Sequence, residues 1–151
     1  MEIPSDAQKF SIEGVRIVRV VSIHDGDTIT CIIPFETAFY KFSIRLNGID
    51  TAEMTSKNVL LKTKALLARS LLFKLITQTN IDTYEWKKRD FDDYLQKNYT
   101  TMKINCKEMD KYGRVLADVS NFADILVQEK LAYRYTGGTK LTEDEQIKFL
   151  Q

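Results

Sequence analysis

The sequence contains few residues of the kinds that cross-link small proteins or build many catalytic sites. Of its 151 residues, two are cysteine and one is histidine. Two cysteines are too few for a disulfide framework and neither has zinc-site spacing, so we interpret Cys31 and Cys106 as buried thiols in apolar strands. A single histidine excludes zinc hydrolase sites with several histidine ligands, and any Ser-His-Asp triad that does not use His24. Catalysis must then use carboxylates and arginines.

Glycine and proline are also scarce, with six and two residues in a chain that is 44% hydrophobic and 28% charged. This composition excludes collagen-like, mucin-like and wholly disordered chains, and it predicts one packed core. No apolar run reaches the roughly 20 residues of a membrane span, and the first residues lack the basic start and apolar stretch of a signal peptide. We therefore expect a soluble, intracellular protein with no membrane partner.

The chain also lacks an excess of charge of either sign, because 22 lysines and arginines face 21 aspartates and glutamates. This balance indicates neither nucleic acid nor membrane as a partner. The one local bias lies between Lys57 and Lys74, where five residues are basic and none is acidic. A solvated helix face accounts for this bias more simply than a phosphate-binding surface does.

Alternating and β-branched apolar residues predict five strands. Residues 1–13 are polar and mixed, which indicates an N-terminal tail or lead-in, and residues 14–151 have the length of a single domain. In the third strand polar residues alternate with apolar ones, which places Arg45 on the face opposite the apolar set. The expected strands span residues 14–21, 28–33, 39–46, 101–107 and 115–119.

Apolar spacing and capping signals predict three helices. The first spans Asn58 to Ile76, the second spans Phe122 to Ala132, and a capping box at Thr142 begins a short third helix. Residues 79–100 have no clean period, so we interpret them as an insertion, more simply a decorated loop than a substrate groove or an aromatic partner surface. Five short strands with a helix after the third are the plan of an OB-fold barrel, so we expect an α+β, mainly β fold.

Polar residues of a few kinds gather where the expected strands end. Taken alone, each group has an ordinary explanation: a hairpin turn at Asp25-Gly26, a helix cap at residues 50–53 and a hairpin connection at residues 110–113. The acidic and guanidinium side chains at these strand ends are Asp25, Asp27, Arg45, Asp50, Glu53, Asp110 and Arg114.

Four segments are specific when they are taken together. They are IHDGDTI at residues 23–29, IRLNGIDTAE at 44–53, DKYGRVLA at 110–117 and ILVQEKLAYRY at 125–135. In this order they resemble the staphylococcal nuclease (thermonuclease) family, and the likeness covers about 100 of the 151 residues. The resemblance implies an OB barrel with three helices and a calcium-dependent nuclease activity.

The resemblance implies a metal site and a water-activating residue. Asp27 and Asp50 are similar to the carboxylates that hold a calcium ion, and the backbone carbonyl of Thr51 is similar to a further ligand. Two carboxylates, a carbonyl and waters suit calcium, which can polarise a phosphoryl oxygen. Glu53 resembles the carboxylate that positions or deprotonates the attacking water, and the sequence leaves open which of the two it does.

The resemblance also implies contacts with nucleic acid. Arg45 and Arg114 resemble the two guanidinium groups that grip the scissile phosphate, for which their fixed fork of donors is well matched. Lys111 and Tyr112 resemble the pair that binds a neighbouring terminal phosphate. Arginine stays charged at every relevant pH, which suits binding to an anionic backbone.

Three further residues lie near the end of the likeness. Tyr133 and Tyr135 stand where family members carry aromatics that stack on a base, with a packing role as the alternative for one of them. Lys140, after Gly137-Gly138, could reach a phosphate, although a surface lysine is the simpler interpretation.

We therefore expect a monomeric, calcium-dependent, sugar-nonspecific endonuclease that hydrolyses single-stranded or frayed DNA and RNA. By resemblance it breaks the bond on the 5′-oxygen side and leaves 3′-phosphate ends. The rival hypothesis is a scaffold domain that binds nucleic acid or protein without cutting, and a third is a nuclease restricted to a structured or modified substrate by residues 79–100. The filled acidic and arginine positions favour the enzyme, because a binding domain has no need of Glu53 beside two ligand carboxylates.

Overall fold

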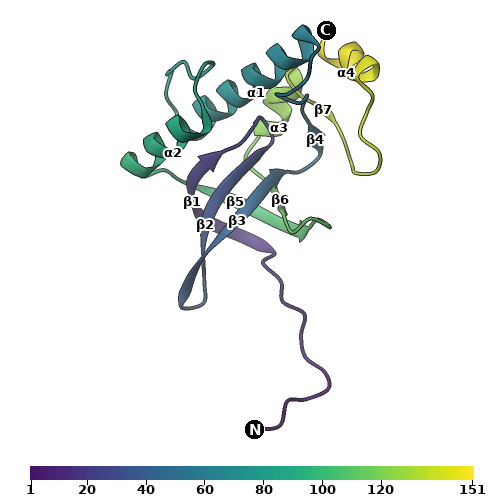
Figure 1. Cartoon of the computed structure of the whole chain (residues 1–151). Helices are drawn as coiled ribbons and strands as arrows, with labels where there is room; N and C mark the ends of the chain where they lie inside the picture. Colours follow the sequence, from purple (N-terminus) through teal and green to yellow (C-terminus); the bar gives the residue numbers. More distant parts are fainter.

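The five expected strands are present and close into a barrel (Figure 1). The computed structural model describes residues 1–151, and its barrel strands are β1 (Gly14–Ile23), β2 (Thr28–Phe35), β3 (Ala38–Leu46), β5 (Thr101–Met109) and β6 (Val115–Asp118). Their order around the barrel is β1-β2-β3-β6-β5, and all neighbours are antiparallel except β3 and β6, which are parallel. This α+β arrangement is an OB-like barrel, as the strand plan predicts.

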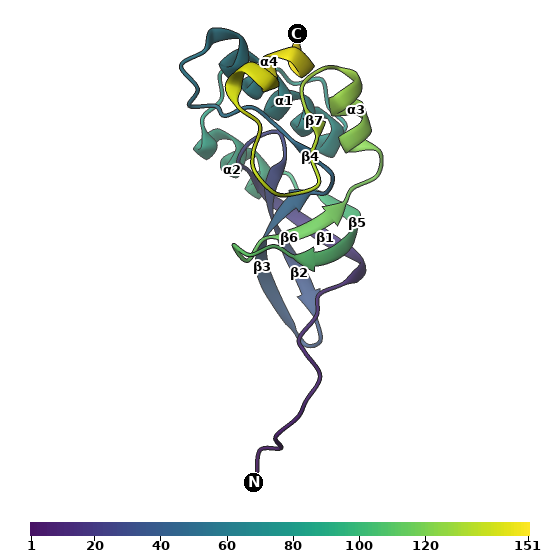
Figure 2. The same ribbon diagram turned by 90° about the vertical axis from the view of Figure 1, so that its right-hand side faces the viewer.

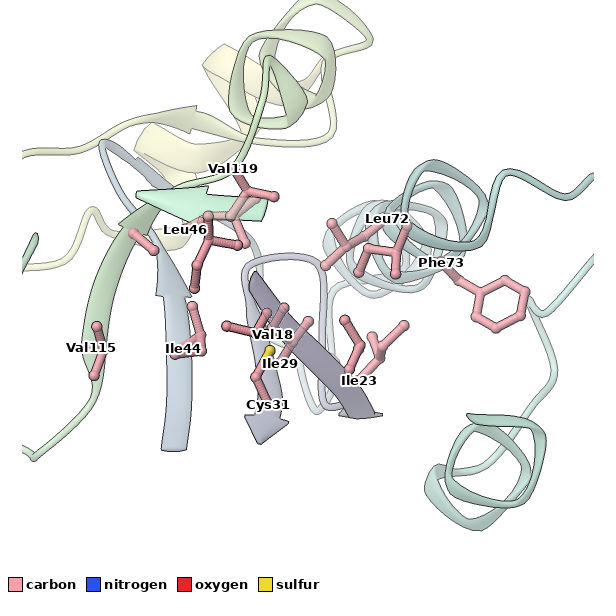
Figure 3. Packing of buried hydrophobic residues seen from close by; sticks show 14 of the residues in the cluster. Val18, Ile23, Ile29, Cys31, Ile44, Leu46, Leu72, Phe73, Val115 and Val119 are labelled. Carbon is pink, nitrogen blue, oxygen red and sulfur yellow. The ribbon is translucent and has the colours of Figure 1, made fainter. Parts of the chain in front are cut away.

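Alternate strand residues fill the barrel. In β2, Ile29, Cys31 and Ile33 are fully buried while the residues between them are half-buried, which is the period of a strand with one core face. Figure 3 shows side chains of the strands gathered beside Leu72 of helix α1 (Val59–Thr77), which belongs to the same core cluster. The prediction that Cys31 and Cys106 are buried thiols is confirmed.

Three helices lie where the sequence predicts them. They are α1 (Val59–Thr77), α3 (Phe122–Gln128) and α4 (Glu143–Leu150). The side chain of Asn58 caps α1, and the expected capping box at Thr142 starts α4. Helix α3 ends earlier than expected, since Lys130 just beyond it adopts a left-handed φ of 58°. No helix of the structure is both long and apolar enough to span a membrane.

The expectation of exactly three helices, with a loop at residues 79–100, is wrong, because this segment contains α2 (Lys88–Lys97). Its Phe91 and Leu95, one turn apart, are fully buried. The Phe91 ring packs edge-on against Trp86 and against Phe73 of α1, with centroids 5.2 and 5.6 Å apart. Because only two positions of this ten-residue helix are buried, its apolar residues do not repeat often enough to predict a helix from the sequence.

A small second sheet connects distant parts of the chain. Strand β4 (Ile49–Asp50) pairs antiparallel with β7 (Tyr133–Arg134), so that Asp50 lies opposite Tyr133. Each strand has only two residues, which leaves no alternation for a sequence pattern to reveal. This sheet holds the segment after β3 against the segment after α3, beside the barrel.

Residues 1–13 contain no helix or strand and extend away from the barrel (Figure 1). The end of this segment is nevertheless attached, since Ile12 is buried and Phe10 packs edge-on against Phe35 with ring centroids 5.2 Å apart. The segment therefore joins the barrel from the end opposite the helices.

Candidate functional site

Four of the expected site residues are buried together beside the barrel. Asp27, Arg45, Asp50 and Thr51 each expose 9% or less of their surface. Asp27 lies in the loop between β1 and β2, Arg45 lies near the end of β3, and the other two lie in and just after β4. Buried ionisable groups need charged or hydrogen-bonding partners, so the contacts among these four define what the site can do. We call Asp27, Asp50 and Glu53, with Arg45 and Thr51, the acid cluster.

Close packing fixes the loop that carries Asp27. The backbone N–H of Asp27 donates to the Asp25 carboxylate at 3.1 Å, and its carbonyl accepts from the N–H of Leu46 at 2.8 Å. At Gly26 the loop lies so near α1 that a Cβ would be 2.5 Å from the Cβ of Ala68. Only glycine leaves room for this approach, which explains the glycine between Asp25 and Asp27.

Arg45 pairs with both buried aspartates. Its Nη2 lies 3.0 Å from Oδ1 of Asp50 and 3.5 Å from Oδ2 of Asp27, while its Nη1 donates to the carbonyl of Ile49 at 2.9 Å. The neighbouring residues of β3 belong to the core, so Arg45 lies on the outer face of the strand. One guanidinium therefore compensates only part of the charge of two buried carboxylates.

The Asp27 carboxylate is fully hydrogen-bonded yet poorly compensated in charge. Its Oδ1 accepts from the hydroxyl of Thr28 at 2.9 Å, and its Oδ2 accepts from the N–H and hydroxyl of Thr51 at 3.2 and 3.1 Å. Burial raises the pKa of Asp27 from 3.8 to about 6; the nearby Asp25 adds to the rise, and Arg45 opposes it. An additional cation would be stabilised here.

Asp50 is held through both of its oxygens. Its Oδ1 also accepts from the N–H of Thr51 at 2.9 Å, and its Oδ2 accepts from the hydroxyl of Tyr133 at 3.1 Å. Burial and the charge of Asp27 raise the pKa of Asp50, while two neighbouring cations lower it. Burial and the charge of Asp50 raise the pKa of Tyr133, so its hydroxyl remains a donor.

The structure separates the two tyrosines that the sequence leaves open. Tyr133 exposes 1% of its surface, so it has the packing role and its ring is not accessible to a base. Tyr135 is half-buried, and the guanidinium of Arg45 lies 5.6 Å from the centroid of its ring. Tyr135 is therefore the tyrosine that borders the acid cluster with part of its surface accessible.

Lys140 contacts the acid cluster, which the sequence does not predict. Its ammonium donates to Oε1 of Glu53 at 2.6 Å and to the carbonyl of Thr51 at 3.2 Å, and it lies 3.6 Å from Oδ2 of Asp50. Partial burial acts to lower the pKa of Lys140, but the bond to Glu53 and the charges of the three acids outweigh burial and raise it. Lys140 lies at the surface, with a side chain that is 35% exposed, but its ammonium is bonded to the acid cluster.

The segment that delivers Lys140 turns back past β4 before α4 begins (Figure 2). Gly137 and Gly138 allow this turn with φ angles of 106° and 85°, a region that favours glycine. The glycine pair is the only local signal of the contact. It is a weak one, because the partners of Lys140 lie 87 and 89 residues earlier in the chain.

The remaining expected residues form a second group, at the turn between β5 and β6. The Asp110 carboxylate accepts from the N–H groups of Tyr112 and Arg114 and, at 2.7 Å, from Nε of Arg114. Partial burial acts to raise the pKa of Asp110, but these bonds outweigh burial and lower it. The cationic groups of Lys111 and Arg114 lie 5.2 and 5.5 Å from the ring centroid of Tyr112, which is 72% exposed.

No hydrogen bond or ion pair joins this second group to the acid cluster. Arg45 of β3 lies opposite Leu116 of β6, and Arg114 lies two residues before Leu116, directly before β6 begins. Arg114 uses only its Nε in its ion pair, and neither Nη group donates within the chain. These free donors remain available to an external anion.

The basic bias of α1 is partly structural. Arg69 is buried, donates to the carbonyl of Trp86 at 2.7 Å, and has its guanidinium 4.8 Å from the ring centroid of Phe91. This residue therefore secures the segment between α1 and α2. The interpretation of a solvated helix face requires all five basic residues to face solvent, and Arg69 does not.

The donor atoms of the acid cluster fit a hard cation. Carboxylate and carbonyl oxygens are the ligands that calcium prefers. The Lys140 ammonium is itself a cation bonded to the Thr51 carbonyl and close to Asp50, so positive charge fits among these oxygens. No group of three or more His, Cys, Asp or Glu side chains could hold a metal ion, so a metal bound here would need the carbonyl and water as further ligands.

No protein-family model and no curated protein matches this chain.

Proposed function

We propose that the protein is a calcium-dependent, sugar-nonspecific nuclease that hydrolyses phosphodiester bonds of DNA and RNA and leaves 3′-phosphate ends. The proposal rests on the likeness of the sequence to the staphylococcal nuclease family, and the OB-like barrel is consistent with that likeness. The observation that carries it is the burial of Arg45 against Asp27 and Asp50, next to the Thr51 carbonyl and Glu53. Separate segments of the chain supply these groups, and a structural ion pair alone requires neither Glu53 nor the carbonyl.

Phosphodiester hydrolysis needs positive charge at the reacting phosphate. The diester is an anion that repels a nucleophile, and negative charge grows on its equatorial oxygens in the transition state. Asp27, Asp50 and the carbonyl of Thr51 would hold calcium. When bound, calcium supplies Lewis acidity toward a phosphoryl oxygen.

In this proposal Glu53 would orient and deprotonate the attacking water. Its side chain is 64% exposed, unlike those of Asp27 and Asp50, so solvent reaches it. In the proposed reaction the water oxygen forms a bond to phosphorus, its proton passes to the Glu53 carboxylate, and the bond from phosphorus to the 5′ oxygen breaks. The departing oxygen takes a proton from solvent, which leaves the phosphate on the 3′ side.

Two arginines would hold the scissile phosphate. Arg114 has both Nη groups free, and its Nε is oriented by Asp110 at 2.7 Å, which fixes the direction of the fork. Arg45 is oriented by Asp50 and by the Ile49 carbonyl. Arg114 directly precedes β6, the strand that pairs with the strand of Arg45, which suits a phosphate bound between the two arginines.

The exposed turn between β5 and β6 would bind the neighbouring part of the nucleic acid. Lys111 and Tyr112 are exposed and close to the free donors of Arg114. Tyr135 lies beside Arg45 and is half-buried, so the accessible part of its ring could stack on a base.

A non-cleaving scaffold is the second candidate, and one contact favours it. Lys140 pairs with Glu53 at 2.6 Å, so the carboxylate assigned to the water is engaged by a cation of the chain itself. A domain that only binds nucleic acid or protein would keep this ion pair permanently.

One experiment separates these two functions. The purified protein is incubated with labelled single-stranded DNA and with labelled single-stranded RNA, in calcium, in magnesium and in chelator. The nuclease proposal predicts calcium-dependent shortening of both strands, 3′-phosphate ends by mass spectrometry, and strongly slowed cleavage in Glu53→Gln. Retention of intact strands in calcium, with no difference between wild type and Glu53→Gln, would establish the scaffold instead.

A further inference from the structure

We infer that Lys140 is a tethered counter-ion: in the absence of a divalent cation its ammonium neutralises the acid cluster, and a divalent cation binds only by displacing it. The inference rests on the proposed calcium site and adds the residue that controls access to it. The chain would thus carry its own competitor for the metal.

The first argument is the position of the ammonium. Its three neighbouring oxygens are the carbonyl of Thr51 at 3.2 Å, Oε1 of Glu53 at 2.6 Å and Oδ2 of Asp50 at 3.6 Å. Two of these belong to residues assigned as metal ligands, and the third belongs to the residue assigned to the attacking water. An ammonium and a metal ion cannot share these oxygens, because both would be cations within contact distance.

The second argument is charge. The three carboxylates of the acid cluster face only one guanidinium, that of Arg45, apart from Lys140. Lys140 removes half of the resulting excess of negative charge, whereas a divalent ion would remove all of it. The divalent ion is therefore the better counter-ion, and the ammonium is the one that serves when no such ion is bound.

The third argument is how Lys140 is attached. The Tyr135 hydroxyl donates to the carbonyl of Gly138, and Thr142 caps α4, so the backbone is held on both sides of Lys140. The ammonium sits on a flexible four-carbon stem and its side chain is 35% exposed. Displacement thus requires rotation of one side chain toward solvent, and the backbone keeps its path.

The test measures calcium binding without nucleic acid. Calorimetric titrations compare wild type, Lys140→Met and Lys62→Met, where Lys62 is an exposed lysine of α1 that forms no ion pair and serves as the matched control for lost charge. We expect calcium affinity to rise on the order of tenfold in Lys140→Met. Lys62→Met should bind calcium as the wild type does.

Thermal unfolding provides a second readout. In chelator, Lys140→Met should unfold at a lower temperature than the wild type, because the carboxylates lose their counter-ion. Saturating calcium should abolish or reverse this difference. Unchanged or weaker calcium binding in Lys140→Met, an equal gain in Lys62→Met, or no calcium uptake by either wild type or Lys140→Met would overturn the inference.

The same titrations separate this inference from the proposed function. If Asp27→Asn weakens calcium binding while Lys140→Met leaves it unchanged, the metal site stands and the tethered counter-ion is wrong. If Lys140→Met binds calcium more tightly but no variant cleaves DNA or RNA, the counter-ion stands and the nuclease proposal is wrong.

Discussion

Arg45 has two roles in the acid cluster, because the guanidinium that would hold phosphate also neutralises part of the charge of Asp27 and Asp50. Arg114 has only one, because its ion pair with Asp110 is partly exposed and its Nη groups are free. Substitution of either arginine should therefore lower the rate of cleavage, but only substitution of Arg45 should also lower the stability of the fold.

We expect Arg114→Ala and Arg45→Ala each to lower turnover on the order of 100-fold or more, the scale of losing one preorganised charge donor. Single-turnover cleavage of labelled single-stranded DNA in calcium measures this. Arg134→Ala is the control, since that arginine forms an exposed surface pair with Asp124, and its rate should stay near that of the wild type.

Arg45→Ala should also lower the urea midpoint of unfolding, because it leaves buried carboxylates unpaired, whereas Arg114→Ala should not. A rate near that of the wild type in Arg114→Ala, with the protein folded, would remove this arginine from the proposed mechanism.

At the scale of elements, the loop between β1 and β2 depends on its contact with α1. A Cβ at Gly26 would approach the Cβ of Ala68 to 2.5 Å and Cγ2 of Thr51 to 3.2 Å. We expect Gly26→Ala to destabilise the protein by about 1–3 kcal/mol, the usual range for an overpacked core, as measured by urea unfolding.

The matched test of this contact is a double-mutant cycle with Ala68→Gly. Removing the Ala68 methyl group relieves the closest clash, so Ala68→Gly should destabilise less in the Gly26→Ala background than in the wild type, or should even stabilise it. Strict additivity of the two free-energy changes would show that the loop does not press on the helix.

Helix α2 and its aromatic neighbours form part of the packed structure. Phe91 is fully buried between Trp86 and Phe73, and the guanidinium of Arg69 lies over its ring. We expect Phe91→Ala to lower the free energy of unfolding by about 3–5 kcal/mol, as for other buried phenylalanines.

Tyr99→Ala, at a ring that is 75% exposed, should lower the free energy of unfolding by less than about 1 kcal/mol. Equal urea midpoints for Phe91→Ala and the wild type would show that the 79–100 segment does not contribute to the stability of the core.

At the scale of the whole molecule, buried acids make stability depend on pH. The pKa of Asp27 rises from 3.8 to about 6 on folding, mainly through burial. Between these values the folded state binds more protons than the unfolded state, so this residue lowers the free energy of unfolding as pH rises from about 4 to about 6. Above about pH 6 the free energy of unfolding has lost the full contribution of Asp27, and below about pH 4 this residue does not lower it.

Asp27→Asn should remove this dependence. Asparagine keeps one oxygen for the two donors of Thr51, and its amide can donate to the Thr28 hydroxyl. In chelator, we expect acidification from about pH 7 to about pH 5 to favour the wild type relative to Asp27→Asn in urea unfolding. A difference between the two proteins that stays constant over this range would contradict the raised pKa.

The strands, three of the helices and the barrel plan follow from local sequence patterns. Period-two burial in β2, the capping box at Thr142 and the outward face of Arg45 are all properties of neighbouring residues, which one segment suffices to specify. Helix α2 escapes the same reasoning, because only two of its positions are buried and its stability comes from rings elsewhere in the chain.

The residues of the acid cluster can be predicted from the sequence, but the hydrogen bonds and ion pairs that join them to Tyr133 and Lys140 cannot. The resemblance of four segments to a known family singles out Asp27, Arg45 and Asp50, but the bond from Tyr133 to Asp50 joins residues 83 positions apart, and the bond from Lys140 to Thr51 joins residues 89 apart. Such contacts depend on how the β4–β7 pair and the glycine turn bring distant backbone together. Short-range periodicity carries no information on that distance, so only the tertiary structure decides which tyrosine is buried and which lysine meets the acids.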